Sequence, residues 1–481
     1  MTATVAVPAW LLVLLLALSG WLLLDRLLVP SARWFLRSRA NRVLEQVNER
    51  LNIRVQPFKL TRRQALVDLL AFDTKVVEAA RQHAEATGMP REAAMAQAER
   101  YAREIVPAFN AYVYFRLGYW LARRLARTLY RVRLGHVDPG ALGSVPENAT
   151  IVFVMNHRSN MDYVLVAFLA AERVALSYAV GEWARVWPLQ ALVRSMGAYF
   201  IRRNSQSPLY RRVLERYVRL ATDNGVAQAV FPEGGLTRDG SLRPPKMGLL
   251  DYMLRGFDPG GERDIVFIPV ALNYDRVLED RTLLAELDRQ APRPGRWAAL
   301  SRTAGFLKRQ AALALGGRWQ RFGYACVNVG APVSARRWAL GEGVDFRKLD
   351  NDARFAAVER LARHLMGRIG AVVPVLPVPL LATVLLRAEG PLSALDLKAR
   401  AAGLITELEA AGARLYLPRR TRDHALDLAL RQLLTRHLAV SDDGTAEGMV
   451  SANPAERHVL AYYANSIAHL LEAGNRAAAA E

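Results

Sequence analysis

A histidine and an aspartate five positions apart are the first side chains in this sequence that could do acid–base chemistry. His157 and Asp162 lie between the apolar run 149–154 and a helical pattern at 163–168, on an expected strand-to-helix turn. There the carboxylate can hold one imidazole nitrogen while the other nitrogen accepts a proton from an attacking hydroxyl. Acyl transfer from a thioester needs this activation, because a neutral alcohol is a poor nucleophile.

The same spacing occurs again at His437 and Asp442, in a helix-to-loop context without other catalytic side chains. The spacing alone therefore does not distinguish a catalytic pair from residues that cap a helix or pack in a core. We expect His437 to have no role in turnover.

Two arginines close the apolar run 198–201. Arg202 and Arg203 place two guanidinium groups at an expected strand end, which suits bidentate capture of a phosphate. The alternative is an ordinary solvated strand end.

Two more clusters follow apolar runs. In the segment 231–238, adjacent glycines allow close backbone approach and Arg238 adds a phosphate-compatible donor, although an ordinary glycine turn would look the same. The segment 268–275 is apolar up to Pro269, and by itself it predicts a plain edge strand.

These clusters belong to a region in which short apolar runs alternate with helical stretches. The runs are 149–154, 198–201, 226–231 and 265–270. Such alternation predicts an α/β domain with a largely parallel sheet flanked by helices, whose functional residues gather beyond the carboxyl ends of the strands.

In order and spacing the four clusters resemble the four blocks of the glycerolipid acyltransferase superfamily, and most closely the bacterial glycerol-3-phosphate acyltransferases. The likeness covers about 151–277. The segment 157–163 matches the first block, and 200–203 has the form of the second block that is typical of enzymes acting on glycerol 3-phosphate. A weaker likeness, at 462–469, is to a C-terminal segment of the bacterial enzyme.

The resemblance implies that His157 is the general base and Asp162 its partner. It places Arg202, Arg203 and Arg238 on the acceptor phosphate, with Lys246 as a secondary phosphate contact. The other implied substrate-binding residues are Arg158, Ser159, Glu233 and Gly234, with Pro269 near the acyl-donor groove. No metal or prosthetic cofactor is expected, because a thioester is already activated.

The third block departs from the family pattern. Relatives usually have arginine and serine where this chain has Leu236 and Thr237. One phosphate-binding arginine is therefore missing, a departure that concerns the acceptor and leaves the histidine–aspartate pair intact. Dihydroxyacetone phosphate or a lysophospholipid stays open as an alternative acceptor.

The resemblance implies transfer of a fatty acyl group from acyl-CoA or acyl-carrier protein to the sn-1 hydroxyl of glycerol 3-phosphate, giving lysophosphatidic acid. A non-catalytic lipid-binding platform is the alternative from another class. The excess of 65 basic over 45 acidic residues, a formal charge of +20, favours an anionic partner. No zinc-finger spacing, aromatic RNA-binding motif or dense basic tail is present, so nucleic acid is not an expected partner.

The N-terminus predicts attachment to membrane phospholipid. Residues 3–24 carry no charged side chain and have about the ~20-residue length of a spanning helix, with arginines only after them. We expect an uncleaved anchor in the cytoplasmic membrane with the rest of the chain facing the cytoplasm; an interfacial helix is the alternative. A basic amphipathic helix at 110–132, with Arg123, Arg127 and Arg131 on one row, either lies in the headgroup layer or packs on its own domain.

Four parts are predicted along the chain: a membrane anchor at 1–25, a helical region at 26–135, the α/β acyltransferase catalytic domain at 136–343 and a helical region at 344–481. The lone Cys326 lies in an apolar run and is expected to be a buried, inert thiol. The proline-containing apolar run 372–386 is too short for a confident membrane span, and we expect it to pack in the interior or to form a kinked interfacial element.

Overall fold

The computed structural model describes residues 58, 61–138, 145–170, 176–181, 189–202, 205–287, 321–417 and 422–478. The predicted anchor at 1–25 and the predicted phosphate ligand Arg203 lie outside these residues. Among the helices within them, none combines the length and apolarity needed to cross a bilayer.

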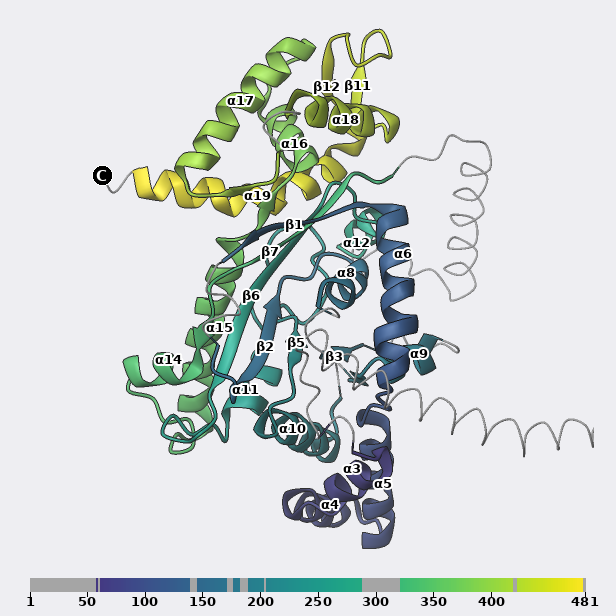
Figure 1. The fold of residues 1–481 in the computed structure, drawn as a ribbon, viewed down its shortest axis with the longest axis vertical. Helices are drawn as coiled ribbons and strands as arrows, with labels where there is room; N and C mark the ends of the chain where they lie inside the picture. The colour runs from purple at the N-terminus through teal and green to yellow at the C-terminus, as the bar shows by residue number, and fades with distance from the viewer. Residues whose placement is uncertain are drawn as a thin grey trace, which may run out of the picture.

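A mixed sheet forms the centre of the molecule (Figure 1). Its strands are β1 (Arg131–Val137), β2 (Thr150–Met155), β3 (Ser177–Val180), β4 (Ala198–Phe200), β5 (Gln228–Val230), β6 (Ile265–Tyr274), β7 (Tyr324–Val329) and β8 (Val333–Ser334). The strand order is β1-β7-β6-β2-β5-β3-β4, with β8 paired to β6. Among the described strands of this sheet, β6 pairs antiparallel with β7 and β8, and the other pairs are parallel. The predicted α/β class with a largely parallel sheet is confirmed.

Helices cover both faces of this sheet (Figure 1). One group is α3 (Arg63–Ala71), α4 (Thr74–Thr87), α5 (Arg91–Ile105), α10 (Pro208–Asp223), α11 (Gly248–Leu254), α14 (Ala335–Gly341) and α15 (Asn351–Gly370). The other elements are η1 (Val113–Gly118), α6 (Tyr119–Leu129), α8 (Met161–Ala170), α9 (Leu189–Ser195), α12 (Asp280–Ala285), α16 (Pro377–Arg387), α17 (Ala394–Ala410), α18 (Arg422–Thr435), η4 (Pro454–Glu456) and α19 (Arg457–Ala478), with short strands β9 (Pro374–Val375), β10 (Arg414–Leu415), β11 (Ala439–Ser441) and β12 (Val450–Ala452).

The side chains of β6 alternate between two hydrophobic cores, as the pleat of a strand requires. Phe267 and Ala271 pack into the core shared with α3–α5, α10, α11, α14 and α15, whereas Val270 and Leu272 pack into the core shared with α6, α8 and α16–α19. All of β6 is buried. A strand covered on both faces is apolar throughout, which explains the uninterrupted apolar run in the sequence.

The expectation of an edge strand around Pro269 is wrong, because β6 lies between β2 and β7. Pro269 has no N–H, and in a strand the N–H and C=O of one residue point to the same side. Its carbonyl accepts from Gly330 N at 2.8 Å, on the side where β8 pairing ends at Phe267 and β7 pairing begins at Val270. The missing donor therefore faces a gap in the pairing.

The basic amphipathic helix is shorter than predicted. It ends at Leu129, and Arg131 begins β1, where it pairs with Tyr324 of β7. The expected row of three helical arginines is therefore wrong at Arg131, because sheet pairing takes over there. β1 also crosses the predicted boundary between 135 and 136. The rest of the predicted division into four parts stays a prediction.

The proline-containing apolar run is buried in the interior. It forms β9 and α16, and the Asp275 carboxylate accepts the backbone N–H of Val378 at 3.0 Å at the start of α16. A side chain from the sheet thus supplies an acceptor for a free N–H at this helix end. This bond joins the residue after β6 to the start of α16, one of the C-terminal helices that lie above the sheet in Figure 1.

Candidate functional site

His157 and Asp162 meet at the carboxyl end of β2, on the turn that leads into α8. Nδ1 of His157 lies 2.9 Å from Oδ2 of Asp162, and both side chains are buried. The geometry expected from their spacing is present. Arg202, Glu233 and Tyr274 follow or close β4, β5 and β6 at the same edge, because the carboxyl ends of parallel strands lie together.

The Asp162 carboxylate is held by several donors besides the histidine. Its Oδ2 accepts the backbone N–H groups of Arg158 at 2.7 Å and Ser159 at 3.1 Å, and its Oδ1 accepts the hydroxyl of Tyr274. An ionised carboxylate is only an acceptor, so the imidazole proton belongs on Nδ1 of His157. Nε2 is then the nitrogen that can accept a proton.

Two aromatic rings fix the orientation of the imidazole. Phe231 stacks on His157 with ring centroids 4.0 Å apart, and Tyr163 meets it edge-on at 5.4 Å. Only 1% of His157 is exposed. Within the described part of the chain Nε2 makes no hydrogen bond, so no protein group competes there for its lone pair.

Tyr274→Phe should lower kcat by roughly tenfold, because a hydrogen bond to a charged group contributes about 1.5–3 kcal/mol. Without this donor the Asp162 carboxylate is held less firmly against the imidazole, so kcat should fall while the KM values stay close to wild type. Steady-state kinetics of thiol release measures this split. Tyr130→Phe is the matched control, since the buried Tyr130 hydroxyl donates to the carbonyl of Arg276. An unchanged kcat in folded Tyr274→Phe would contradict a positioning role.

Glu233 joins the first and third sequence clusters. Its Oε1 accepts the backbone N–H of His157 at 2.8 Å and its Oε2 accepts that of Arg243 at 2.9 Å. Burial raises the pKa of the Glu233 carboxyl to about 7. Both oxygens bond to the protein backbone, so Glu233 shapes the site by fixing the two loops.

The raised pKa of Glu233 predicts a pH-dependent stability. The folded protein holds this proton more tightly than the unfolded chain, so the stabilisation is complete below the unfolded pKa and is lost as pH rises through about 7. Since one pKa unit corresponds to ~1.4 kcal/mol, the loss between about pH 4.5 and 8 is roughly 3 kcal/mol. The difference in Tm between the wild-type protein and Glu233→Gln should shrink over this range, and a constant difference would contradict the prediction.

The residues 231–247 between β5 and α11 are here called the third-block loop, and Gly234 lets the start of this loop approach Lys246 near its end. Its φ is +67°, and a Cβ at this position would lie 2.6 Å from Cδ of Lys246. The backbone N–H of Lys246 donates to the carbonyl of Pro232 at 2.7 Å. The glycine thus lets a lysine stem lie over the loop while its exposed ammonium stays at the surface.

Two of the predicted phosphate ligands form ion pairs with the protein. Nη2 of Arg202 lies 2.6 Å from Glu104, and its guanidinium also lies over the ring of Tyr101. Nε of Arg238 lies 3.5 Å from Glu286, with both side chains about half exposed. Exposed pairs contribute little to stability, so Arg238 can exchange its carboxylate for a substrate phosphate at small cost.

Arg158 and Ser159 are buried in this structure. Nη1 of Arg158 donates to the carbonyl of Gly240 at 2.7 Å, and its guanidinium lies over the ring of Tyr462. The Ser159 hydroxyl donates to Glu279 at 2.8 Å. Both side chains hold the turn between β2 and α8 to its neighbours, and their contact with substrate stays a prediction. The substrate-binding roles of the other predicted residues, including buried Pro269, also stay predictions.

The sequence did not single out Tyr274, Glu279 or Arg243 as site residues. Tyr274 is the last residue of β6, four positions beyond the fourth apolar run, so that run did not mark it. Glu279 had no sequence signal either, because its bonds to Ser159 and Asn160 span about 120 positions of the chain and depend on the fold.

The last helix, α19, packs against the third-block loop. Asn465 Nδ2 donates to the carbonyl of Asp239 at 2.9 Å, and Tyr462 lies beside Gly240 and Arg158. Gly240 has a φ of +88°, and a Cβ there would lie 1.8 Å from the carbonyl oxygen of Tyr462. The weaker likeness at 462–469 therefore falls on the segment that supports the site.

Two other reactive side chains lie away from this chemistry. Cys326 is fully buried, and burial raises its pKa to about 12, as expected for an inert thiol. His437 is exposed, with a φ of +57° just after α18, and the Asp442 carboxylate instead accepts the backbone N–H groups of Asp443 and Met449.

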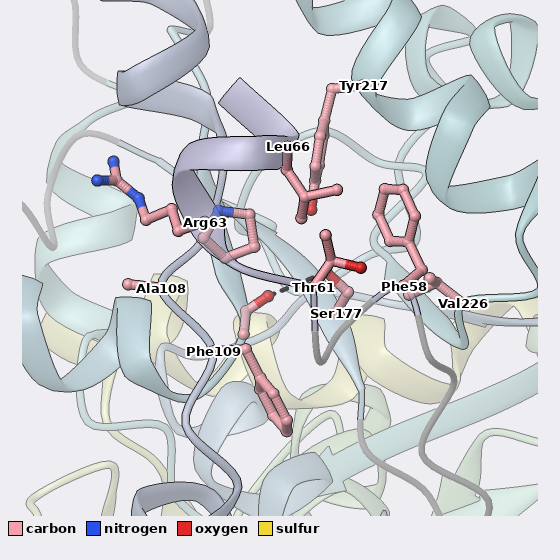
Figure 2. Close-up of a pocket in the computed structure, with 11 residues that line it drawn as sticks. Phe58, Thr61, Arg63, Leu66, Ala108, Phe109, Ser177, Tyr217 and Val226 are labelled. Atoms are coloured by element: carbon pink, nitrogen blue, oxygen red, sulfur yellow. Dashed lines mark hydrogen bonds between the residues drawn. The ribbon is translucent and has the colours of Figure 1, made fainter. Parts of the chain in front are cut away.

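A cavity of about 170 Å³ lies at the opposite edge of the sheet (Figure 2). Ser177, Gly197 and Val226 line it, and they stand at the amino ends of β3, β4 and β5. The Arg63 side chain, which donates to the backbone carbonyls of Val106 and Arg103, points away from the other lining groups in Figure 2. This cavity does not contain the histidine–aspartate pair.

Comparisons with known proteins find acyltransferases among the proteins that this chain resembles. A family model described as Acyltransferase matches residues 141–273, and a model described as Glycerol-3-phosphate acyltransferase C-terminal region matches residues 313–473. A glycerol-3-phosphate acyltransferase of Aeromonas hydrophila is 30% identical over 423 residues, covering 86% of this chain and 50% of the relative. Over most of its length this chain is therefore similar to glycerol-3-phosphate acyltransferases.

A second glycerol-3-phosphate acyltransferase, from Pseudomonas fluorescens (strain SBW25), is 28% identical over 447 residues, covering 90% of this chain and 51% of the relative. The chain thus spans about half the length of the curated glycerol-3-phosphate acyltransferases that it matches. A solved 1-acyl-sn-glycerophosphate acyltransferase from Thermotoga maritima aligns with a TM-score of 0.30 and 17% identity, over 53% of this chain and 78% of that one.

Proposed function

We propose that this protein transfers a fatty acyl group from acyl-CoA or acyl-carrier protein to the sn-1 hydroxyl of glycerol 3-phosphate, giving lysophosphatidic acid. The observation that carries the proposal is the 2.9 Å contact of His157 Nδ1 with Asp162 at the carboxyl end of β2. The acyltransferase family match over 141–273 includes this pair. The names of the relatives supply glycerol 3-phosphate as the first acceptor to consider.

The proposed reaction is general-base catalysis. Nε2 of His157 takes the proton of the acceptor hydroxyl as its oxygen forms a bond to the thioester carbonyl carbon. The carbon–sulfur bond then breaks, and the departing thiolate takes the proton from the imidazolium. Asp162 stabilises that imidazolium through Nδ1 and keeps the ring in position. Atoms and charge balance without another reactant.

Relatives usually have a phosphate-binding arginine where this chain has Leu236. We assign the role of that missing arginine to Arg243. Its Nη1 donates to the backbone carbonyl of Leu236 at 3.1 Å, and its backbone shares the Glu233 carboxylate with His157. It therefore lies in the third-block loop, whose exposed cations are Arg238 and Lys246. Three cations on one loop suit an acceptor with a phosphate.

Arg243→Gln should raise the KM for glycerol 3-phosphate by roughly tenfold while the KM for acyl-CoA stays unchanged, because a charge-assisted bond contributes about 1.5–3 kcal/mol. Steady-state kinetics with each substrate varied in turn measures this split. Arg347→Gln is the control, since the exposed Arg347 pairs with Asp258 and Asp345 instead. Equal changes in both KM values would contradict the assignment.

The proposal is tested by thiol release from palmitoyl-CoA, and from acyl-carrier protein, with purified protein in detergent. Glycerol 3-phosphate, dihydroxyacetone phosphate and lysophosphatidic acid are compared as acceptors. Release that requires glycerol 3-phosphate supports the proposal. Preference for another acceptor would contradict glycerol 3-phosphate as the acceptor, and the change would be traced to Leu236 in the third block. No release with any donor would favour a lipid-binding platform.

We also propose that the protein resides in the cytoplasmic membrane with its catalytic domain on the cytoplasmic side. The support is the uncharged segment 3–24 followed by arginines. Extraction of cell membranes with sodium carbonate should leave the protein in the pellet, and protease added to intact spheroplasts should not cleave the catalytic domain. Release by carbonate would exclude a spanning anchor.

A further inference from the structure

α6, with the end of η1, carries an apolar stripe on its outer side. The exposed fractions are 48% for Leu117, 56% for Trp120, 41% for Leu121 and 40% for Leu125. Residues spaced by three, four and eight positions share one face of a helix. A tryptophan exposed by more than half, together with three leucines on one face, is more apolar surface than scattered single residues would give.

The inner side of α6 is already used. Ala122 and Ala126 are buried in the core that α6 shares with α8. In Figure 1 α6 stands along one side of the sheet, next to α8. The helix is therefore fixed by small residues on one face, and the stripe on the other face contributes nothing to that packing.

Arginines accompany the apolar stripe. By helical spacing Arg116, Arg123 and Arg127 lie on one flank of it. Arg124 lies within the stripe, three positions from Leu121 and four from Trp120, and its guanidinium lies 6.0 Å from the Trp120 ring centre. In the described part of the chain no carboxylate pairs with Arg116, Arg123 or Arg124. Unpaired guanidinium groups on flexible stems next to an apolar face match the boundary between lipid headgroups and acyl chains.

We propose that this face of α6 docks on the surface of an anionic lipid bilayer, with Trp120 and the leucines at the acyl boundary and the arginines among the headgroup phosphates. The row of arginines favours anionic over neutral lipid. Since α6 packs on α8, whose first turn contains Asp162, docking would hold the turn between β2 and α8 close to the membrane surface. The inference is independent of turnover and of the N-terminal anchor.

The test places a fluorescent probe on the stripe of the full-length chain. Leu121→Cys is labelled with an environment-sensitive dye, and the native Cys326 does not compete because it is buried. Leu395→Cys on α17, exposed by 77%, is the matched control. Each labelled protein is mixed with vesicles of phosphatidylcholine and phosphatidylglycerol that carry a nitroxide on the upper acyl chain, and with phosphatidylcholine vesicles alone.

The expected result is a blue shift and nitroxide quenching of the dye at 121 in anionic vesicles, at a depth of roughly 5–10 Å below the headgroups, with much less in neutral vesicles. Arg116→Gln combined with Arg123→Gln should reduce the quenching. The dye at 395 should not respond. Equal responses at both positions, or none at 121, would overturn the proposal. So would a dye at 121 that is already blue-shifted without lipid, since another part of the chain would then cover the stripe.

Discussion

His157→Ala should lower kcat for thioester turnover by roughly 10²–10⁴-fold, the range that a positioned general base contributes. The Nε2 atom is lost, and neither Asp162 nor Tyr274 can replace it, because both lie on the Nδ1 side of the ring. Thiol release from palmitoyl-CoA with glycerol 3-phosphate measures the effect. The KM values should change less than kcat, since the base acts in the chemical step.

A second histidine provides the control for this prediction. His437→Ala should leave turnover unchanged, because His437 is exposed after α18 and stands apart from the β2–α8 turn. Since His157 stacks on Phe231, removal of its ring also opens a cavity. The Tm of His157→Ala is therefore measured in parallel, and His157→Gln keeps more of the volume. Turnover that survives in folded His157→Gln at near wild-type level would contradict the assignment of the base.

Gly240→Ala should both unfold the protein more easily and depress turnover. A Cβ at 240 would lie 1.8 Å from the backbone carbonyl oxygen of Tyr462, so α19 or the third-block loop must move. Overpacking and a left-handed φ together predict a loss of about 3 kcal/mol or more in the free energy of unfolding. Turnover falls because Thr237, in the same loop, donates its backbone N–H to the carbonyl of His157.

Gly412→Ala separates backbone strain from displacement of the loop. Gly412 also has a positive φ, +74°, but nothing lies within 4 Å of a Cβ built there. It should cost only about 1–2 kcal/mol and leave kcat unchanged. Denaturant unfolding and thiol release measure both variants. Equal effects of the two substitutions would show that α19 does not support the site.

The β-like runs and the His157–Asp162 pair could be predicted from sequence because their signals are local. Four runs became β2, β4, β5 and β6, and both members of the pair lie on the one turn after β2, five positions apart. The buried state of Cys326 followed from its apolar neighbours in the same way. The roles of these residues in catalysis stay predictions.

The remaining features depend on contacts between distant segments. β1 and β7 pair across about 190 positions, and Arg131 reads as helical until that pairing is known. The position of Pro269 inside a central strand depends on the gap between β7 and β8. The pairing of Arg202 with Glu104 and the support of Asp162 by Tyr274 likewise have no signature in either segment alone.

The most direct test of the central claim is mass spectrometry of the product formed from palmitoyl-CoA and ¹³C-labelled glycerol 3-phosphate. The account predicts a labelled monoacyl glycerol phosphate from the wild-type protein, esterified at the sn-1 position, and roughly 10²-fold less or lower from His157→Ala in the same time. Comparable amounts of labelled product from both proteins would contradict the role of His157. Absence of any labelled product from the wild-type protein with either acyl-CoA or acyl-carrier protein would contradict the proposed reaction.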